Sequence, residues 1–102
     1  MQFDVHVNPA ASSDHAPFLL DVQADLLAVL ETRVVVPLVR ATVFGRRASR
    51  LHPAFDVAGE QVVMATHLLA AIRRAGLGVR VGSLAEQRED VIAAVDVLLA
   101  GV

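Results

Sequence analysis

The 102-residue sequence contains no cysteine, tryptophan or tyrosine, and aromatic residues make up only 4% of it. Without cysteine the chain cannot form disulfides, bind metals through thiolates or use a thiol nucleophile, which fits a reducing compartment. The longest uncharged stretches, such as residues 61–72, fall short of the roughly 20 residues that a membrane-spanning helix needs. These absences exclude a disulfide scaffold and a membrane span.

The chain also lacks a basic leader and a net positive charge. Its first residues, Met1-Gln2-Phe3-Asp4, are not a basic region followed by an apolar stretch, so they do not match a secretory signal. We therefore expect a cytoplasmic protein. The formal charge is −2, whereas proteins that bind nucleic acids or anionic membranes need a basic field, so we expect no direct nucleic-acid or membrane partner.

Apolar residues are abundant, at 55% of the sequence. The length predicts one domain over residues 1–102, and a domain of about 100 residues buries only about two-thirds of the surface of its unfolded chain. The sequence thus holds more apolar side chains than one small core can absorb. It predicts an apolar contact surface.

Most of the chain has the patterns of short strands. Polar and apolar residues alternate over residues 2–8 and 18–25, and β-branched residues mark a strand over residues 33–42. Pro37 interrupts this last segment and cannot donate a ladder hydrogen bond. We therefore place Pro37 at an edge, a bend or a bulge.

The segment Ala58-Gly59-Glu60 predicts a hairpin turn between two further strands, because glycine tolerates a positive φ. We also expect a strand over residues 77–81, whereas residues 68–74 fit either a helical turn or a strand. Several short strands with turns between them indicate a small barrel or sandwich over about residues 1–82.

The last segment predicts a helix over about residues 83–100. Ser83 and Glu86 have the spacing of a capping box, and Asp96 is the only charged residue after position 90. Apolar side chains form one stripe and a second beside it, so a second protein should cover part of this helix. The dimer-interface residues that we expect are Val91, Ile92, Val95, Leu98 and Leu99, and Val102 extends the first stripe.

The sequence offers no convincing catalytic or metal site. Ser13, Asp14 and His15 are triad residue types, but consecutive side chains diverge, and we place Asp21 and Asp25 too far apart on one strand to act as a close carboxylate pair. The four histidines, His6, His15, His52 and His67, lack the spacing of zinc ligands. We expect no catalytic residues, metal or cofactor.

One segment contains a cluster of four of the nine basic residues, Arg40, Arg46, Arg47 and Arg50. One interpretation is a solvated loop. The other is a docking site for an acidic peptide, because guanidinium groups pair with carboxylates through two hydrogen bonds. The sequence leaves both open.

Taken in order, several short segments resemble the CcdB family, the toxin half of a bacterial toxin–antitoxin system. The resemblance runs from end to end and rests on the order and spacing of these segments. They are Met1-Gln2-Phe3, Leu20-Asp21-Val22-Gln23-Ala24-Asp25 with Leu26-Leu27, Arg33-Val34-Val35-Val36-Pro37-Leu38, Leu51-His52-Pro53, Gly59-Glu60, and a helix from Leu84 to the closing Gly101-Val102.

The resemblance implies a fold that is mainly β with a C-terminal helix, an SH3-like barrel of the CcdB/Kid type, assembled as a homodimer through its helices. It also implies a non-enzymatic toxin with a role in plasmid maintenance, which binds the A subunit of DNA gyrase and traps its cleaved-DNA complex. A cognate antitoxin would neutralise it, and we assign Arg40, Arg46, Arg47 and Arg50 to that partner. The implied gyrase-binding residues are Leu26, Leu27, Asp96, Leu99, Ala100, Gly101 and Val102.

Two alternatives stay open. Well-studied members of the family have an aromatic residue and Trp where this chain has Leu99 and Ala100, and Asn where it has Asp96, and aromatic anchors often dominate interface energetics. The first alternative is therefore a non-toxic dimeric homologue that still binds its antitoxin. The second is a ribonuclease toxin on the same fold.

Overall fold

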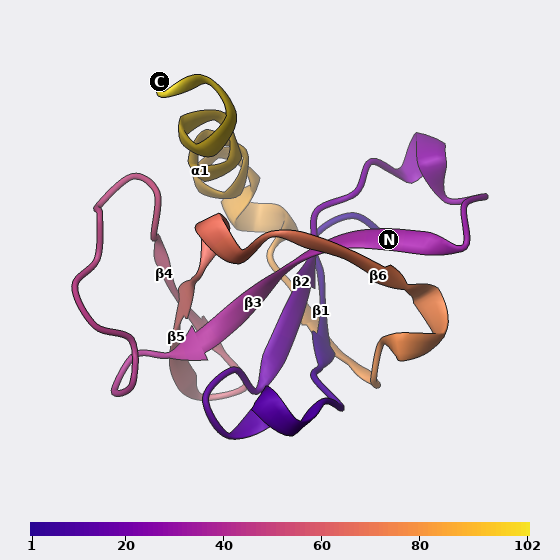
Figure 1. Cartoon of the computed structure of the whole chain (residues 1–102), viewed down its shortest axis with the longest axis horizontal. Coiled ribbons are helices and arrows are strands. Elements are labelled where there is room, and N and C mark those ends of the chain that lie inside the picture. The colour runs from indigo at the N-terminus through magenta and orange to yellow at the C-terminus, as the bar shows by residue number, and fades with distance from the viewer.

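A sheet of short strands is followed by one C-terminal helix (Figure 1). The computed structural model describes residues 1–10 and 12–102, which contain seven strands and one α-helix. The strands are β1 (Asp4–Val7), β2 (Phe18–Asp21), β3 (Thr32–Arg40), β4 (Ala54–Val57), β5 (Glu60–Met64), β6 (Ala70–Arg73) and β7 (Arg80–Ser83), and the helix is α1 (Arg88–Ala100). Single 3₁₀ turns are η1 (Ala11–Asp14), η2 (Asp25–Leu27), η3 (Thr66–Leu68), η4 (Arg74–Gly76) and η5 (Ala85–Gln87).

The strands form one antiparallel sheet in the order β4-β5-β3-β2-β1-β7. β3 is its centre: one edge pairs with β2, and the other pairs first with β6, over residues 32–35, and then with β5, over residues 38–40. The predicted strand over residues 33–42 is therefore correct in place, and residues 68–74 divide between η3, β6 and the start of η4.

Pro37 lies in this central strand. Of the three predicted positions, an edge, a bend or a bulge, the edge is therefore wrong. Its carbonyl oxygen accepts a hydrogen bond from the N–H of Ala65, at 3.0 Å, and its ring nitrogen faces the same side because the two groups of one strand residue point the same way. On that side the pairing with β6 has ended and the pairing with β5 has not begun. Proline is tolerated because no neighbouring strand needs its missing N–H.

The core lies between one face of the sheet and α1. Its buried members come from both, and burying each Val or Leu side chain contributes about 1.5–3 kcal/mol. The cluster contains Phe3, Val5, Leu20, Val36, Leu38, Phe55, Val57, Val62, Met64, Leu84, Val91 and Ala94. α1 also contacts η3, so its N-terminal half is part of the fold and not an appendage.

The predicted hairpin is confirmed. β4 and β5 pair up to Val57 and Glu60, and the two residues between them, Ala58 and Gly59, have φ values of 51° and 79°. A two-residue turn with both φ values positive matches the right-handed twist of the strands it joins.

Three predicted boundaries are wrong by three residues or more. The second strand ends at Asp21 and not at residue 25. Beyond Asp21 the side chain of Gln23 takes the place of backbone hydrogen bonds between the strands. Its Oε1 accepts from the N–H of Val34 and its Nε2 donates to the carbonyl of Leu27, both at 3.0 Å. Asp25 then begins η2. The polar–apolar alternation continues past the point where this side chain ends the strand.

The other two boundaries lie near the C-terminus. β7 covers Arg80–Ser83 and not residues 77–81, and the helix begins at Arg88 and not at Ser83. Ser83 pairs with Asp4 as a strand residue, and its hydroxyl accepts from the N–H of Ala85, at 3.1 Å, so it closes a turn into η5 and forms no capping box.

The fold class is confirmed as mainly β with a C-terminal helix. No helix among the described residues is long and apolar enough to cross a membrane.

Candidate functional site

An apolar loop follows β2. It covers residues 24–31, includes η2, and exposes Leu26, Leu27, Val29 and Leu30; Leu26 is 91% exposed. Four exposed aliphatic side chains on one short loop are costly in water, and such patches mark sites of contact with other molecules.

The apolar loop is fastened at both ends. The carboxylate Oδ1 of Asp25 accepts from the backbone N–H of Gln2, at 2.7 Å, and the side chain of Gln23 donates to the carbonyl of Leu27. At the other end Nη2 of Arg74 donates to the carbonyls of Ala28 and Leu30. The exposed leucines are therefore presented on a positioned backbone.

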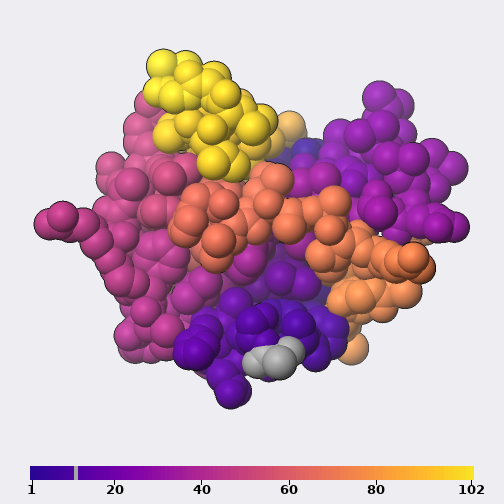
Figure 2. Space-filling view, in the orientation of Figure 1, coloured from indigo at the N-terminus to yellow at the C-terminus, as the bar shows by residue number. Residues whose placement is uncertain are grey.

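The end of α1 is a second apolar surface. Leu99 is 75% exposed, Val102 is also exposed, and Asp96, Ala100 and Gly101 lie on the surface with them. Gly101 adopts a φ of 77° and donates its N–H to the carbonyl of Val97, which ends the helix in the left-handed geometry that glycine favours. Figure 2 shows this end (yellow) and the loop region (purple) as separate protrusions at the upper edge of the molecule.

All seven residues predicted to bind gyrase thus have exposed surface. The five predicted dimer residues differ in exposure: Val91 is fully covered by its own chain, Val95 packs partly against the core, Leu98 is partly buried, and Ile92 and Leu99 are exposed. The side of α1 that carries Val91 packs against the core. Val91 is therefore not available to a second copy of the chain.

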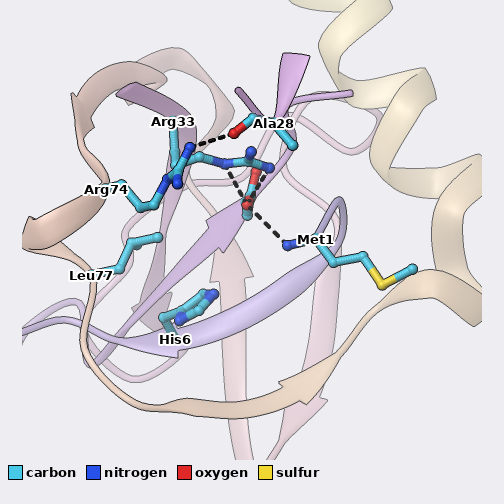
Figure 3. A pocket seen from close by; sticks show the side chains of 7 residues that line it. Met1, His6, Ala28, Arg33, Arg74 and Leu77 are labelled. Carbon is cyan, nitrogen blue, oxygen red and sulfur yellow. Dashed lines mark hydrogen bonds and ion pairs between the residues drawn. The ribbon is translucent and has the colours of Figure 1, made fainter. Parts of the chain in front are cut away.

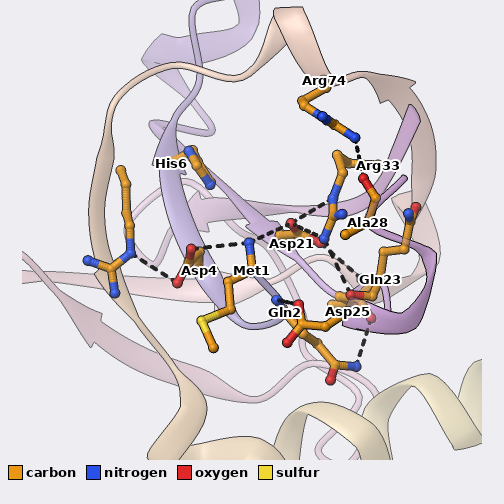
Figure 4. A network of polar contacts seen from close by, with 12 residues as sticks. Met1, Gln2, Asp4, His6, Asp21, Gln23, Asp25, Ala28, Arg33 and Arg74 are labelled. Atoms are coloured by element: carbon orange, nitrogen blue, oxygen red, sulfur yellow. Dashed lines mark hydrogen bonds and ion pairs between the residues drawn. The ribbon is translucent and has the colours of Figure 1, made fainter. Parts of the chain in front are cut away.

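A buried polar network lies beneath the apolar loop (Figure 4). The side chain of Arg33, only 5% exposed, donates to Asp21 Oδ2 through Nη2, at 2.7 Å, and through Nε, at 2.9 Å. The N-terminal ammonium lies 3.7 Å from the same oxygen and 3.3 Å from Asp4. The network ties β1, β2, β3 and the N-terminus together.

Asp4 is the outer carboxylate of this network. Burial alone would raise its pKa, but the hydrogen bonds and charges of Arg80 and the N-terminal ammonium outweigh that effect and lower the pKa below its usual value. Nε of Arg80 lies 3.0 Å from Asp4 Oδ1. Asp4 is therefore ionised at neutral pH and fixes the N-terminus.

A cavity of about 310 Å³ opens beside the network (Figure 3). Its lining comes from β1, β2, β3, the apolar loop and the turns after β6, so no single motif encodes it. The lining residues are Met1, His6, Asp21, Ala28, Arg33, Arg74 and Leu77. Sequence reasoning missed this cavity, although it noted His6 and Asp21 individually.

The arginine segment is not uniformly free. Arg40 forms an ion pair with Glu60 and donates through Nε to the carbonyl of Asp14, and Arg47 donates to the carbonyl of His52, at 3.0 Å. Arg46 and Arg50 are exposed. Two of the four arginines thus hold the fold, and two extend into solvent.

His52 and His67 meet, although they are 15 positions apart. The N–H of Ala48 donates to Nδ1 of His52, at 2.9 Å, so the proton of the neutral ring lies on Nε2, which donates to Nδ1 of His67, at 2.9 Å. Burial, then the charge of His67 and that of Arg47, lower the pKa of His52. This contact pins the arginine segment to η3.

The remaining residues of catalytic type lie in two places. Ser13 and Asp14 lie in η1, followed by His15, and Asp21 and Asp25 have different partners, Arg33 and Gln2. No group of three metal-ligating side chains occurs within the described part of the chain.

Comparison with known proteins gives one family and two structural relatives. The family model described as CcdB protein matches residues 2–101, whereas no curated protein matches the sequence. The Mycobacterium tuberculosis toxin MazF-mt6 is similar in structure, with a TM-score of 0.72 and 18% identity over 91% of this chain and 92% of that chain. An endoribonuclease solved in complex with its cognate antitoxin, from a mycobacterial species, has a TM-score of 0.77 and 15% identity over 97% of this chain and 93% of its own.

Proposed function

Because the chain belongs to the CcdB family of toxins from toxin–antitoxin systems, we propose that it acts as a toxin by binding the A subunit of DNA gyrase and trapping the cleaved-DNA complex. The single observation that carries this proposal is the exposure of Leu26 on a positioned loop. The mode of action is binding, so no catalytic group is assigned.

The binding surface consists of the apolar loop and the end of α1. Leu26 and Leu27 supply one half, and the other half is Leu99, Ala100, Gly101 and Val102 with Asp96. Exposed aliphatic side chains gain free energy when a partner removes them from water, at about 25 cal/mol per Å². Leu99 and Ala100 offer less area than an aromatic pair, so we expect weaker binding than an aromatic anchor would give.

A DNA cleavage assay with purified gyrase tests this function. The wild-type protein should increase the amount of linear DNA released when the gyrase is denatured, and Leu26→Asp should not, because a carboxylate cannot be buried in an apolar contact without a partner. Val43→Asp is the matched control, since Val43 is an exposed valine on the distant arginine segment. Equal amounts of linear DNA with and without the wild-type protein would contradict the proposal.

We place the homodimer contact on the outer side of α1, through Ile92, and extend it to the neighbouring η3, where Leu68 is exposed. Leu99, which the sequence predicted for both surfaces, is assigned to the gyrase surface. The antitoxin would take the arginine segment through Arg46 and Arg50, the two arginines that extend into solvent. Sedimentation of the wild type and of Ile92→Asp tests the dimer: the variant should be monomeric, and a monomeric wild type would contradict it.

The two alternatives have their own tests. If the chain is a non-toxic homologue, Ala100→Trp should create toxicity on expression without antitoxin, because Trp restores an aromatic anchor. A ribonuclease is favoured by the shared fold of the mycobacterial endoribonuclease and disfavoured by the net charge of −2. Cleavage of RNA by the purified protein would establish it.

A further inference from the structure

The cavity beside the apolar loop is lined by more positive than negative charge. Arg33, Arg74 and the N-terminal ammonium of Met1 line it, and Asp21 is the one carboxylate among its described lining residues. Asp21 is already shared by Arg33 and the ammonium. Arg74 has no carboxylate within ion-pair distance among the described residues, since its hydrogen bonds go to the carbonyls of Ala28 and Leu30.

Hydrogen-bond donors remain unused at this cavity. The bonds of Arg33 involve Nε and Nη2, and those of Arg74 involve Nη2 alone. In the described part of the chain no buried side-chain nitrogen lacks a partner, so the remaining nitrogen of the almost buried Arg33 must reach open space. Arg33 is one of the residues that line the cavity.

His6 is oriented on the same wall. Its Nδ1 lies 3.0 Å from the carbonyl oxygen of Gly78, which can only accept, so Nδ1 carries the proton and Nε2 is free. A Cβ at position 78 would lie 2.4 Å from the carbonyl oxygen of Val7, so only glycine lets this segment come close enough for the contact. Figure 3 shows His6, Arg33 and Arg74 around the cavity, with Met1 on its opposite side.

We propose that this cavity is a carboxylate-binding site, which takes an acidic side chain of a peptide segment of a protein partner. The guanidinium group of Arg74, which has no carboxylate partner among the described residues, suits an oxyanion, and charge-assisted bonds to an oxyanion are stronger than neutral ones. The walls also contain the apolar side chains of Leu77 and Ala28, and the exposed Leu26 and Leu27 lie on the adjoining loop.

This mixture selects a peptide over a nucleic acid. An acidic residue flanked by leucines would place its carboxylate in the cavity and its neighbours on the apolar loop, whereas a polyanion would meet the net negative charge of the whole chain. The site does not depend on the identity of the partner, so it stands or falls separately from gyrase binding.

Titration of the ¹⁵N-labelled protein with two capped tripeptides, acetyl-Leu-Glu-Leu-amide and acetyl-Leu-Gln-Leu-amide, tests the proposal by amide chemical shifts. The glutamate peptide should shift the signals of His6, Leu77 and Gly78 and bind at least about tenfold more tightly than the glutamine peptide, which loses the charge-assisted bonds. Arg74→Gln should lower the affinity for the glutamate peptide about fivefold or more.

Arg73→Gln is the matched control, because Arg73 is the exposed neighbour of Arg74 and does not line this cavity; its affinity should equal that of the wild type. Equal affinity for the two peptides, or shifts confined to other residues, would overturn the site. Tighter binding of inorganic phosphate or of a ribodinucleotide than of the glutamate peptide would overturn the choice of a carboxylate.

Discussion

Asp21 and Arg33 are the residues on which the buried network depends. Both are almost fully buried, and each bonds to the other at 2.7 Å. A buried ion pair contributes little net stability compared with apolar residues of the same shape, but removing one partner leaves an uncompensated charge. The pair therefore makes the region sensitive to single substitutions.

We predict that Arg33→Met lowers the free energy of unfolding by about 3 kcal/mol, because Asp21 then keeps only the more distant ammonium as a cationic partner. Urea denaturation measures the change. Arg46→Met, at an exposed position, should stay within about 0.5 kcal/mol of the wild type. An equally small change for Arg33→Met would show that the pair is not buried as described.

The contact between His52 and His67 predicts a pH dependence. Since the pKa of His52 is lowered in the fold, the unfolded chain binds more protons near pH 6, and stability is lost as the pH falls below the ordinary histidine value of 6.5. The charged groups that face His52 are His67 and Arg47, and their charges lower its pKa further. The ring of Phe44 also packs against His52, with 4.9 Å between the ring centroids.

The free energy of unfolding should therefore fall between pH 7.5 and pH 5.5, and it should fall less in His52→Gln, which cannot gain the proton. His15→Gln, at an exposed histidine, should retain the wild-type dependence. Asp4, with its lowered pKa, contributes only at more acidic pH. Identical slopes for His52→Gln and the wild type would refute this role of the ring.

At the scale of elements, α1 has two apolar sides with different roles. Val91 and Ala94 belong to the core, whereas Ile92 and Leu99 are exposed. The sequence pattern showed both stripes but could not assign them, because periodicity reports only that a face is apolar and not what covers it.

Truncations on the two sides of α1 should therefore differ. Val91→Ala removes methyl groups from a fully buried site and should cost about 2 kcal/mol of unfolding free energy, as measured by thermal or urea denaturation. Leu99→Ala should leave stability of the isolated chain almost unchanged and reduce partner binding instead. A similar stability loss in the two variants would contradict this division of the helix.

The sequence pattern predicted an element correctly where neighbouring residues determine that element. Ala58-Gly59 was identifiable because the turn needs positive φ at adjacent positions. The end of β2 was not, because it depends on Gln23 bonding to Val34, eleven residues later. The helix start failed for a similar reason: Ser83 is held in the sheet by Asp4, at the other end of the chain.

At the scale of the molecule, the surface residues could be inferred and the cavity could not. Leu26 and Leu99 are conspicuous in a sequence with too many apolar residues for its core. The cavity instead needs His6, Arg33 and Arg74 brought together from separate strands and turns, and their separation in the sequence carries no motif. The topology of the sheet brings the cavity residues together, and their spacing in the sequence does not predict it.

Calorimetric titration of the purified A subunit of gyrase tests most directly whether the apolar loop and the end of α1 form the partner-binding surface. The wild type should bind, Leu26→Asp and Leu99→Asp should each weaken binding at least about tenfold, corresponding to about 1.4 kcal/mol, and Val43→Asp should bind as the wild type does. Absence of binding by the wild type, or equal affinity for all four proteins, would show that these two surfaces do not bind gyrase.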